Sequence, residues 1–202
     1  MSDSTKTYLA LGDSYTSGTS IAFPVNFPNQ LADGIKAVTG KGITVKIVAQ
    51  NAWRTDDLQR GIKRSDLDDT YDLISLLIGV NNQYQGLPLA DFEKDFRRLL
   101  DTAITYSGKD QNRIFVLSLP NYGYTPYGAE KKEQITTELA MFNALTQSIC
   151  VELGIDYYNI TDISLEAENN SDYRASDNLH PSALQYAAWV SSIIDRVIAK
   201  LN

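Results

Sequence analysis

The only histidine of the chain lies in a setting that is typical of a catalytic base. His180 belongs to the segment Asp177-Asn178-Leu179-His180-Pro181, and Pro181 disfavours helical dihedrals at the residue before it. Asp177, on the same tight turn, is within reach of the Nδ1–H group of the imidazole. Such a carboxylate fixes the tautomer and leaves Nε2 free to accept a proton. The pattern therefore indicates a functional histidine rather than a surface one.

A serine that this base could activate lies near the start of the chain. Ser14 belongs to the stretch Gly12-Asp13-Ser14, which follows an apolar run and precedes further hydroxyl-bearing residues. At a turn between a strand and a helix, a serine Oγ lies near exposed backbone N–H groups and can act as a nucleophile. Two other interpretations fit the same residues. Asp13 or Ser14 caps a helix, or residues 14–19 form a hydroxyl-lined phosphate cradle, as in flavodoxin-like FMN sites.

Two adjacent amide side chains form a third polar group. Asn81 and Asn82 follow Gly79 and Val80 after a buried apolar run. Adjacent asparagines are often turn formers. If Asn81 faces the same cleft as Ser14, however, its side-chain N–H can donate to an oxyanion that develops during acyl transfer.

The apolar pattern predicts the elements that must bring these residues together. Short runs rich in β-branched residues alternate with longer stretches whose apolar residues recur every three or four positions. The first pattern is typical of strands buried on both faces, and the second of helices that cover them. We predict strands at 7–11, 43–49, 73–80, 114–119 and 155–160, helices over 92–104, 135–153 and 184–201, and a polar surface loop at 164–176.

This order of elements predicts an α/β fold, namely a three-layer α/β/α sandwich around a five-stranded parallel sheet. Ligands of open parallel sheets bind beyond the carboxyl ends of the strands, and Ser14, Asn81 and His180 each follow a predicted strand. The length of 202 residues fits a single domain that spans residues 1–202, with residues 1–5 expected to be disordered.

Composition and charge argue against several classes of function. The net charge of −7 disfavours nucleic acid as a partner, because binding phosphates requires a positive patch. One cysteine and one histidine cannot form a metal site of His and Cys ligands within one chain. No apolar run has the length of a membrane span, and the apolar run near the N-terminus is too short for the core of a signal peptide, so we expect no stable membrane insertion and a cytoplasmic location. Nothing in the pattern specifies an oligomeric state.

Taken together and in order, four blocks of the chain resemble the SGNH hydrolases, also called GDSL esterases/lipases. The resemblance covers nearly the whole chain. It implies the flavodoxin-like sheet topology of that family and a serine ester hydrolase that cleaves small acyl esters. The blocks are Gly12-Asp13-Ser14, Asn51-Ala52-Trp53-Arg54-Thr55, Gly79-Val80-Asn81-Asn82 and Asp177-x-x-His180-Pro181.

The resemblance also implies a role for individual residues. Ser14 would be the nucleophile, His180 the general base and then acid, and Asp177 the carboxylate that orients the imidazole. The oxyanion hole would be formed by the backbone N–H of Ser14, the backbone N–H of Ala52 and the side chain of Asn81. No metal and no organic cofactor is expected.

The chain departs from the family pattern at two positions. Ala52 stands where glycine is usual, and if the turn is left-handed there, its Cβ costs roughly 1–2 kcal/mol. Asn82 stands where an aspartate is common, which removes a negative charge near the cleft. These departures keep one alternative open, a catalytically impaired family member that acts as a binding module. The other alternative is the FMN binder suggested by the hydroxyl-rich loop.

Aromatic side chains in the loops after the strands are candidates for the wall of a substrate pocket. A modest aromatic pocket would suit short acyl esters or acetylated sugars better than long-chain lipids. The candidate residues are Tyr15, Trp53, Arg54, Tyr84 and Tyr122.

Overall fold

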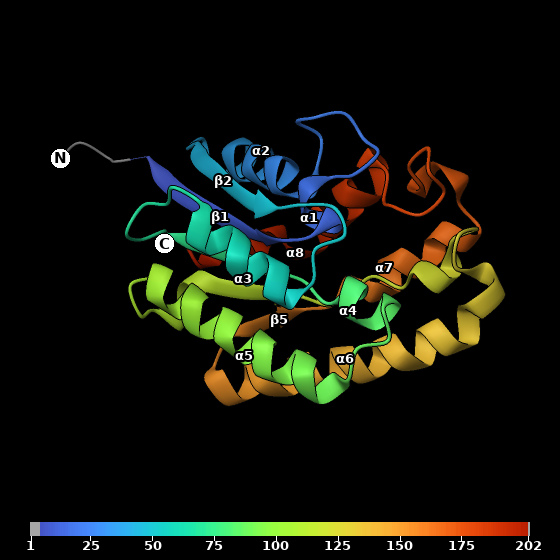
Figure 1. Ribbon diagram of the computed structural model, residues 1–202. Coiled ribbons are helices and arrows are strands. Elements are labelled where there is room, and N and C mark those ends of the chain that lie inside the picture. Colours follow the sequence, from blue (N-terminus) through green and yellow to red (C-terminus); the bar gives the residue numbers. More distant parts are fainter. Residues whose placement is uncertain (1–4, 202) are drawn as a thin grey trace.

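The computed structural model describes residues 5–201, so the disorder expected at the N-terminus falls, except for Thr5, on residues outside the described range. The described chain is built on a parallel sheet with the strand order β2-β1-β3-β4-β5, which confirms the predicted fold class (Figure 1). The strands are β1 (Lys6–Gly12), β2 (Ile43–Ala49), β3 (Leu73–Leu77), β4 (Ile114–Leu117) and β5 (Asp156–Tyr158).

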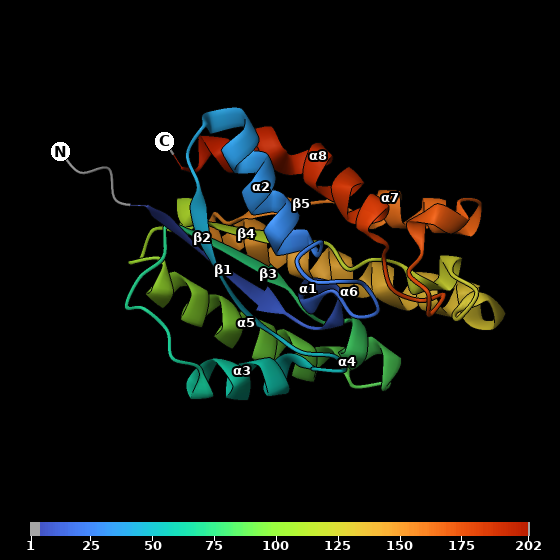
Figure 2. The ribbon, with the colours of Figure 1, turned by 90° about the horizontal axis from the view of Figure 1, so that it is seen from above.

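Helices cover both faces of the sheet, because each presents one apolar stripe to it. One face is covered by α2 (Phe27–Thr39) and α8 (Ala183–Ala199), which pack against each other (Figure 2). The other face is covered by α3 (Thr55–Arg64), α5 (Leu89–Tyr106) and α6 (Lys132–Leu153). Phe96, Leu139 and Val197 belong to the predicted helical stripes and are buried in the core between these layers. Leu184, which was predicted to belong to the apolar stripe of the last helix, is instead exposed, and Trp189 on another face of that helix is buried.

Burial along the strands follows their place in the sheet. Every residue of the central strand β3 is buried, as its mostly apolar sequence predicts, and the hydroxyl of Ser75, its one polar residue, is hydrogen-bonded to that of Tyr8. The edge strand β2 instead alternates between half-buried and exposed positions, with Thr44 and Lys46 facing solvent. Polar side chains on an edge strand also discourage pairing with other chains.

Three predicted strands and one predicted loop differ from the observed segments. The predicted strand 73–80 ends at Leu77, because Gly79 adopts a φ of 137° and Val80 begins the short helix α4 (Val80–Tyr84). The strands predicted to reach 119 and 160 likewise stop at Leu117 and Tyr158. The polar stretch 164–176 is not a plain loop, because it includes the end of the helix α7 (Thr161–Leu165) and the 3₁₀ turns η4 (Glu166–Glu168) and η5 (Ser171–Tyr173). The side chain of Asn170 caps η5 by accepting a hydrogen bond from the Asp172 N–H.

The carboxyl ends of the strands carry short helices rather than long ones. The helix α1 (Ser14–Ser17) follows β1 at once, and α4 follows β3, the neighbouring strand of the sheet (Figure 2). The close approach requires glycine at position 12, because a Cβ there would lie 2.1 Å from Thr16 Oγ1 and 2.5 Å from the Leu77 carbonyl oxygen. Further 3₁₀ turns are η1 (Gln111–Arg113), η2 (Tyr122–Tyr124) and η3 (Ala129–Lys131). Within residues 5–201, no helix combines the length and the apolar character that crossing a bilayer requires.

Candidate active site

A cavity of about 120 Å³ lies at the carboxyl ends of the strands, and each of the four sequence blocks contributes a polar residue to its lining. Ser14, Asn81 and His180 all line this cavity. They come from α1, from α4 and from the segment before α8, which are far apart in the sequence. The parallel sheet thus brings together the residues that the sequence pattern singled out. The other lining residues are Tyr15, Asn51, Val80, Tyr84, Tyr122, Tyr127 and Leu179.

Ser14 is held at the first turn of α1 by the residue before it. The Asp13 carboxylate caps this helix by accepting a hydrogen bond from the Tyr15 N–H at 3.0 Å. The capping interpretation of Asp13 is therefore confirmed. It does not compete with a chemical role for Ser14, because the cap uses the Asp13 carboxylate, while Ser14 itself lines the cavity.

His180 is fixed through both its ring and its backbone by Asp177. The imidazole Nδ1 lies 2.6 Å from Asp177 Oδ2, while Oδ1 accepts hydrogen bonds from the backbone N–H groups of Leu179 and His180, each at 2.9 Å. The turn is possible because Asn178 adopts a left-handed conformation with a φ of 57°. The His180 carbonyl then accepts from the Ala175 N–H at 2.8 Å, which ties the turn to the preceding segment.

Ser20 is a further partner of the same carboxylate, which the sequence pattern did not single out. Its Oγ donates a hydrogen bond of 2.6 Å to Asp177 Oδ2. Burial raises the pKa of Asp177, but the hydrogen bonds from Ser20 and from His180 outweigh it and hold the pKa well below the usual aspartate range. The carboxylate is therefore charged at neutral pH and favours a proton on Nδ1 of His180.

The side chain of Asn81 is oriented by two acceptors. Its Nδ2 donates to the Trp53 carbonyl at 3.0 Å and contacts Asp13 Oδ2 at 3.4 Å. The second distance is longer than that of a usual N–H···O hydrogen bond, so this N–H is held only weakly. A stronger acceptor that enters the cavity can therefore compete for it.

Asp13 is a fully buried carboxyl group directly beside the serine. Burial raises the pKa of Asp13 to about 7, although the hydrogen bonds from Tyr15 and Asn81 oppose the shift. Asp13 and Asp177 thus lie near the same cavity with pKa values displaced in opposite directions.

Asp13 is expected to lower the free energy of unfolding as the pH rises towards about 7, and Asp13→Asn, which has no titrating group at this position, should remove this dependence. Because its folded pKa is raised, its contribution to stability is full below the unfolded pKa and is lost as pH rises through about 7. Asp13→Asn should therefore gain stability relative to the parent by up to about 4 kcal/mol between roughly pH 4 and pH 8. Urea unfolding of both proteins across this range measures the difference, and a difference that stays constant with pH would contradict the prediction.

The backbone at position 52 is left-handed, as the usual glycine of the family would allow. Ala52 has a φ of 65°. Neither its N–H nor that of Ser14 has a hydrogen-bond acceptor in the described part of the chain. Ser14 lines the cavity, whereas Ala52 is not among its lining residues and follows one of them, Asn51.

Ala52→Gly is expected to stabilise the fold, because it removes the steric cost of a Cβ in the left-handed region. The gain should be about 1 kcal/mol, since the greater freedom of glycine in the unfolded chain offsets part of the relief. The midpoint of urea unfolding measures it. An unchanged or lower midpoint would mean that the turn bears no strain at Ala52.

Asn82 has a structural role that accounts for the amide at this position. Its Oδ1 accepts from the Thr55 N–H at 3.1 Å, and its Nδ2 donates to Thr55 Oγ1 at 2.9 Å. The buried amide thus joins α4 to the start of α3. An aspartate at this position could not donate the second of these hydrogen bonds, which uses the amide nitrogen.

The candidate pocket residues divide into two groups. Tyr15, Tyr84 and Tyr122 line the cavity. Trp53 and Arg54 are not among its lining residues. The Trp53 indole packs so closely over α3 that a Cβ on Gly61 would lie 2.2 Å from it, and Arg54 is paired with the nearby carboxylates of α3.

Tyr127 also lines the cavity, although the sequence pattern did not indicate it. It lies in the same loop as Tyr122 but several residues further from β4, and it is half exposed. Its hydroxyl is hydrogen-bonded to that of Tyr84 at 2.8 Å. Position relative to a strand end was the only available signal, and it does not distinguish among the tyrosines of this loop. No group of three or more His, Cys, Asp or Glu side chains within residues 5–201 is arranged to hold a metal ion.

Comparison with protein families gives a match over most of the chain. The model of the GDSL-like Lipase/Acylhydrolase family matches residues 10–188, which include all four sequence blocks. No curated protein sequence matches the chain.

Solved structures share the fold at low sequence identity. A lipase/acylhydrolase from Enterococcus faecalis has a TM-score of 0.75 and 15% identity, with 98% of this chain and 97% of that chain covered. The psychrotrophic esterase EstA from Pseudoalteromonas sp. has a TM-score of 0.70 and 15% identity, with 98% and 99% covered. An acetyl xylan esterase from Geobacillus stearothermophilus has a TM-score of 0.74 and 17% identity, with 95% and 94% covered.

Proposed function

This chain belongs to the GDSL-like lipase/acylhydrolase family, and from that premise we propose that it is a serine esterase of small acyl esters with Ser14, His180 and Asp177 as its triad. The single observation that carries the proposal is the shared cavity. Ser14 and His180 line the same small space, and the imidazole of His180 is hydrogen-bonded at Nδ1 to an ionised carboxylate. A nucleophile, a base and an orienting acid are the set that acyl transfer to water requires.

The proposed reaction is acyl transfer in two steps. His180 Nε2 accepts the proton of Ser14 Oγ as this oxygen attacks the ester carbonyl, and His180 then protonates the leaving alcohol. Water next attacks the acyl group on Ser14 and gives its proton to His180. The acid leaves and the hydroxyl of Ser14 is restored. Asp177 stays ionised throughout and stabilises the imidazolium that forms in each step.

The negative charge on the carbonyl oxygen would be met by three donors. The backbone N–H groups of Ser14 and Ala52 have no acceptor among the described residues 5–201, and one N–H of the Asn81 side chain is bound only weakly by Asp13. Asn81 is kept in place by its bond to the Trp53 carbonyl. Donors that are already oriented contribute most to lowering the barrier, about 3 kcal/mol each.

The size and lining of the cavity favour a short acyl group. The cavity of about 120 Å³ is lined in part by the apolar residues Val80 and Leu179 and by Tyr15. This is well below the volume of typical pockets for larger ligands, about 300–1,000 Å³. An acetyl or similarly short group fits such a space, whereas a long chain does not.

The site does not favour the FMN alternative. The carboxyl groups of Asp13 and Asp177 lie near the hydroxyl-rich loop, and Asp177 is ionised, so that a phosphate would be repelled. The hydroxyl of Ser20, directly after this loop, already donates its hydrogen bond to Asp177 rather than to a phosphate. The alternative within the family, a binding module without catalysis, predicts that Ser14 does not react with a probe for active serines.

Labelling with a fluorophosphonate probe tests the proposal without knowledge of the natural substrate. We expect the purified protein to be modified on Ser14, as peptide mapping by mass spectrometry would show. Ser14→Ala should abolish the labelling, while Ser17→Ala, a matched change on the same helix, should retain it. Absence of labelling in the folded parent would favour a binding module, and labelling at another residue would refute the assignment of Ser14.

A further inference from the structure

A second, larger cavity adjoins the candidate active site. It measures about 300 Å³ and shares Tyr84, Tyr122 and Tyr127 with the cavity that Ser14 and His180 line. The centroids of the three tyrosine rings lie 6.2 to 6.5 Å apart, so the rings contact one another and form a tyrosine wall common to both cavities. An ester whose carbonyl lies at Ser14 can therefore extend along this wall into the larger cavity.

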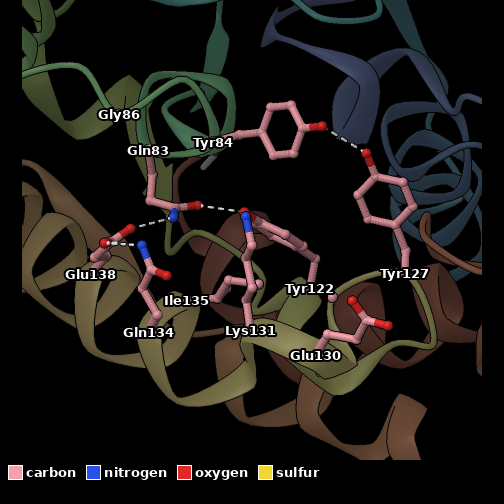
Figure 3. Close-up of a pocket in the computed structure, with 11 residues that line it drawn as sticks. Gln83, Tyr84, Gly86, Tyr122, Tyr127, Glu130, Lys131, Gln134, Ile135 and Glu138 are labelled. Atoms are coloured by element: carbon pink, nitrogen blue, oxygen red, sulfur yellow. Dashed lines mark hydrogen bonds between the residues drawn. The ribbon is translucent and has the colours of Figure 1, made fainter.

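A carboxylate on the far side of the larger cavity is held rigidly by amides. Glu138, on α6, accepts hydrogen bonds from Gln83 Nε2 at 2.6 Å and from Gln134 Nε2 at 2.9 Å (Figure 3). Gln83 is fixed in turn, because its Oε1 accepts from the Tyr122 hydroxyl at 2.9 Å. The network therefore reaches from α6 to the tyrosine wall.

This carboxylate can only accept further hydrogen bonds. The hydrogen bonds from Gln83 and Gln134 hold the pKa of Glu138 below its ordinary value, so the group is ionised near neutral pH. A carboxylate has about four lone-pair sites, and the two amides occupy two of them. A ligand of this cavity therefore gains most if it brings hydroxyl or amine donors.

The other lining groups favour a neutral ligand over a charged or apolar one. Glu130 and Lys131 bring both signs of charge to the same cavity, and Ile135 is an apolar residue at its edge. A long acyl chain would strip water from these charged groups without replacing their hydrogen bonds. Tyr84 and Tyr127 are 56% and 53% exposed and offer flat surfaces to carbon-bound hydrogens.

We propose that the larger cavity binds the alcohol part of the ester and that this alcohol is a neutral polyol, such as a sugar ring. This proposal rests on the proposed function, because the short acyl group must lie in the smaller cavity beside Ser14. The hydroxyl groups of the sugar would donate to Glu138 and accept from Lys131, while a ring face packs on the tyrosine wall. After the leaving oxygen takes its proton from His180, the free polyol departs from the larger cavity.

Two esters of equal ring size test the preference. Glucose acetylated on its primary hydroxyl presents a polyol, whereas cyclohexylmethyl acetate presents a ring of the same size without hydroxyl groups. We expect kcat/KM to be at least about tenfold higher for the sugar ester, because an unpaired polar cavity disfavours the hydrocarbon ring. Acetylcholine is the third substrate, and a higher kcat/KM for it than for the sugar ester would overturn the polyol assignment in favour of a cationic alcohol.

Variants connect the preference to the cavity. Glu138→Gln keeps the size of the side chain but removes its charge, and should lower the ratio of the two kcat/KM values, sugar ester over cyclohexylmethyl ester, by about tenfold. Gln147→Ala, on the exposed face of the same helix, should leave the ratio unchanged. A ratio that is the same in Glu138→Gln and in the parent would overturn the proposal.

Failure of this proposal can be distinguished from failure of the proposed function. If the protein hydrolyses para-nitrophenyl acetate and Ser14 is labelled, but the two ring esters react equally, only the polyol assignment is wrong. If there is neither hydrolysis nor labelling, the esterase proposal is wrong and the polyol assignment falls with it.

Discussion

Ser14→Ala is expected to lower kcat for para-nitrophenyl acetate by roughly 10⁴-fold or more, because no other group can take the place of the Oγ nucleophile. The loss should appear in kcat rather than in KM, since the cavity and its donors remain. The fold should also remain, because the cap of α1 is the bond between the Asp13 carboxylate and the Tyr15 N–H.

The matched control for this variant is Ser17→Ala. Ser17 lies on the same short helix but does not line the cavity. Its hydroxyl donates one long hydrogen bond, of 3.4 Å, to the Ser14 carbonyl. Its activity should stay within about twofold of the parent, as is usual for a surface change. If Ser14→Ala unfolds at the same temperature as the parent and still hydrolyses the ester at a similar rate, Ser14 is not the nucleophile.

The sheet could be predicted from the sequence because a strand that is buried on both faces has a nearly continuous run of apolar residues. After Lys6 and Thr7 the residues of β1 are apolar, those of β3 are apolar except Ser75, and all of these are buried. The ends of the strands were less predictable, since Ile78 and Val80 are also apolar and buried although they lie beyond β3. What ends the strand is the backbone of Gly79, and an apolar pattern does not record a dihedral angle.

The site was predictable where its parts are close in sequence. Asp177 and His180 lie on one turn, so the spacing alone predicts their hydrogen bond. Ser20 and Tyr127 reach the site through loops whose course depends on tertiary packing, and a serine or a tyrosine in a loop is too common to be singled out. A left-handed backbone at Ala52 is suggested only by the glycine that is usual at this position of the family, because alanine itself does not indicate a positive φ.

The two carboxyl groups near the cavity differ because their surroundings differ. Asp13 is fully buried and burial dominates, which raises its pKa to about 7. Asp177 accepts hydrogen bonds from Ser20, from the His180 ring and from two backbone N–H groups, which lower its pKa. Only Asp177 is therefore ionised across the whole neutral range, and only an ionised group can stabilise an imidazolium. Environment thus assigns the orienting role to Asp177 even though Asp13 is adjacent to the serine.

Asp177→Asn is expected to lower kcat by roughly 10⁴-fold although it changes only one atom of the side chain. The amide oxygen can still accept from the backbone N–H groups of Leu179 and His180, so the turn should be kept. The amide nitrogen, however, would face Nδ1 of His180 at the place of Oδ2. Because it can only donate, it favours the tautomer with the proton on Nε2, and this nitrogen can then no longer accept the proton of Ser14.

Nitrogen NMR of the imidazole provides a readout that a merely structural role of Asp177 would not move. The parent should carry its neutral-form proton on Nδ1 and Asp177→Asn on Nε2. Ser20→Ala is the matched control, since it removes one hydrogen bond to Oδ2 but leaves the charge and the tautomer. Its loss of kcat should be about 10- to 100-fold, as expected for one hydrogen bond to a charged group. If Asp177→Asn carries the same tautomer as the parent, or loses no more activity than Ser20→Ala, Asp177 does not orient the base and the proposed triad is wrong.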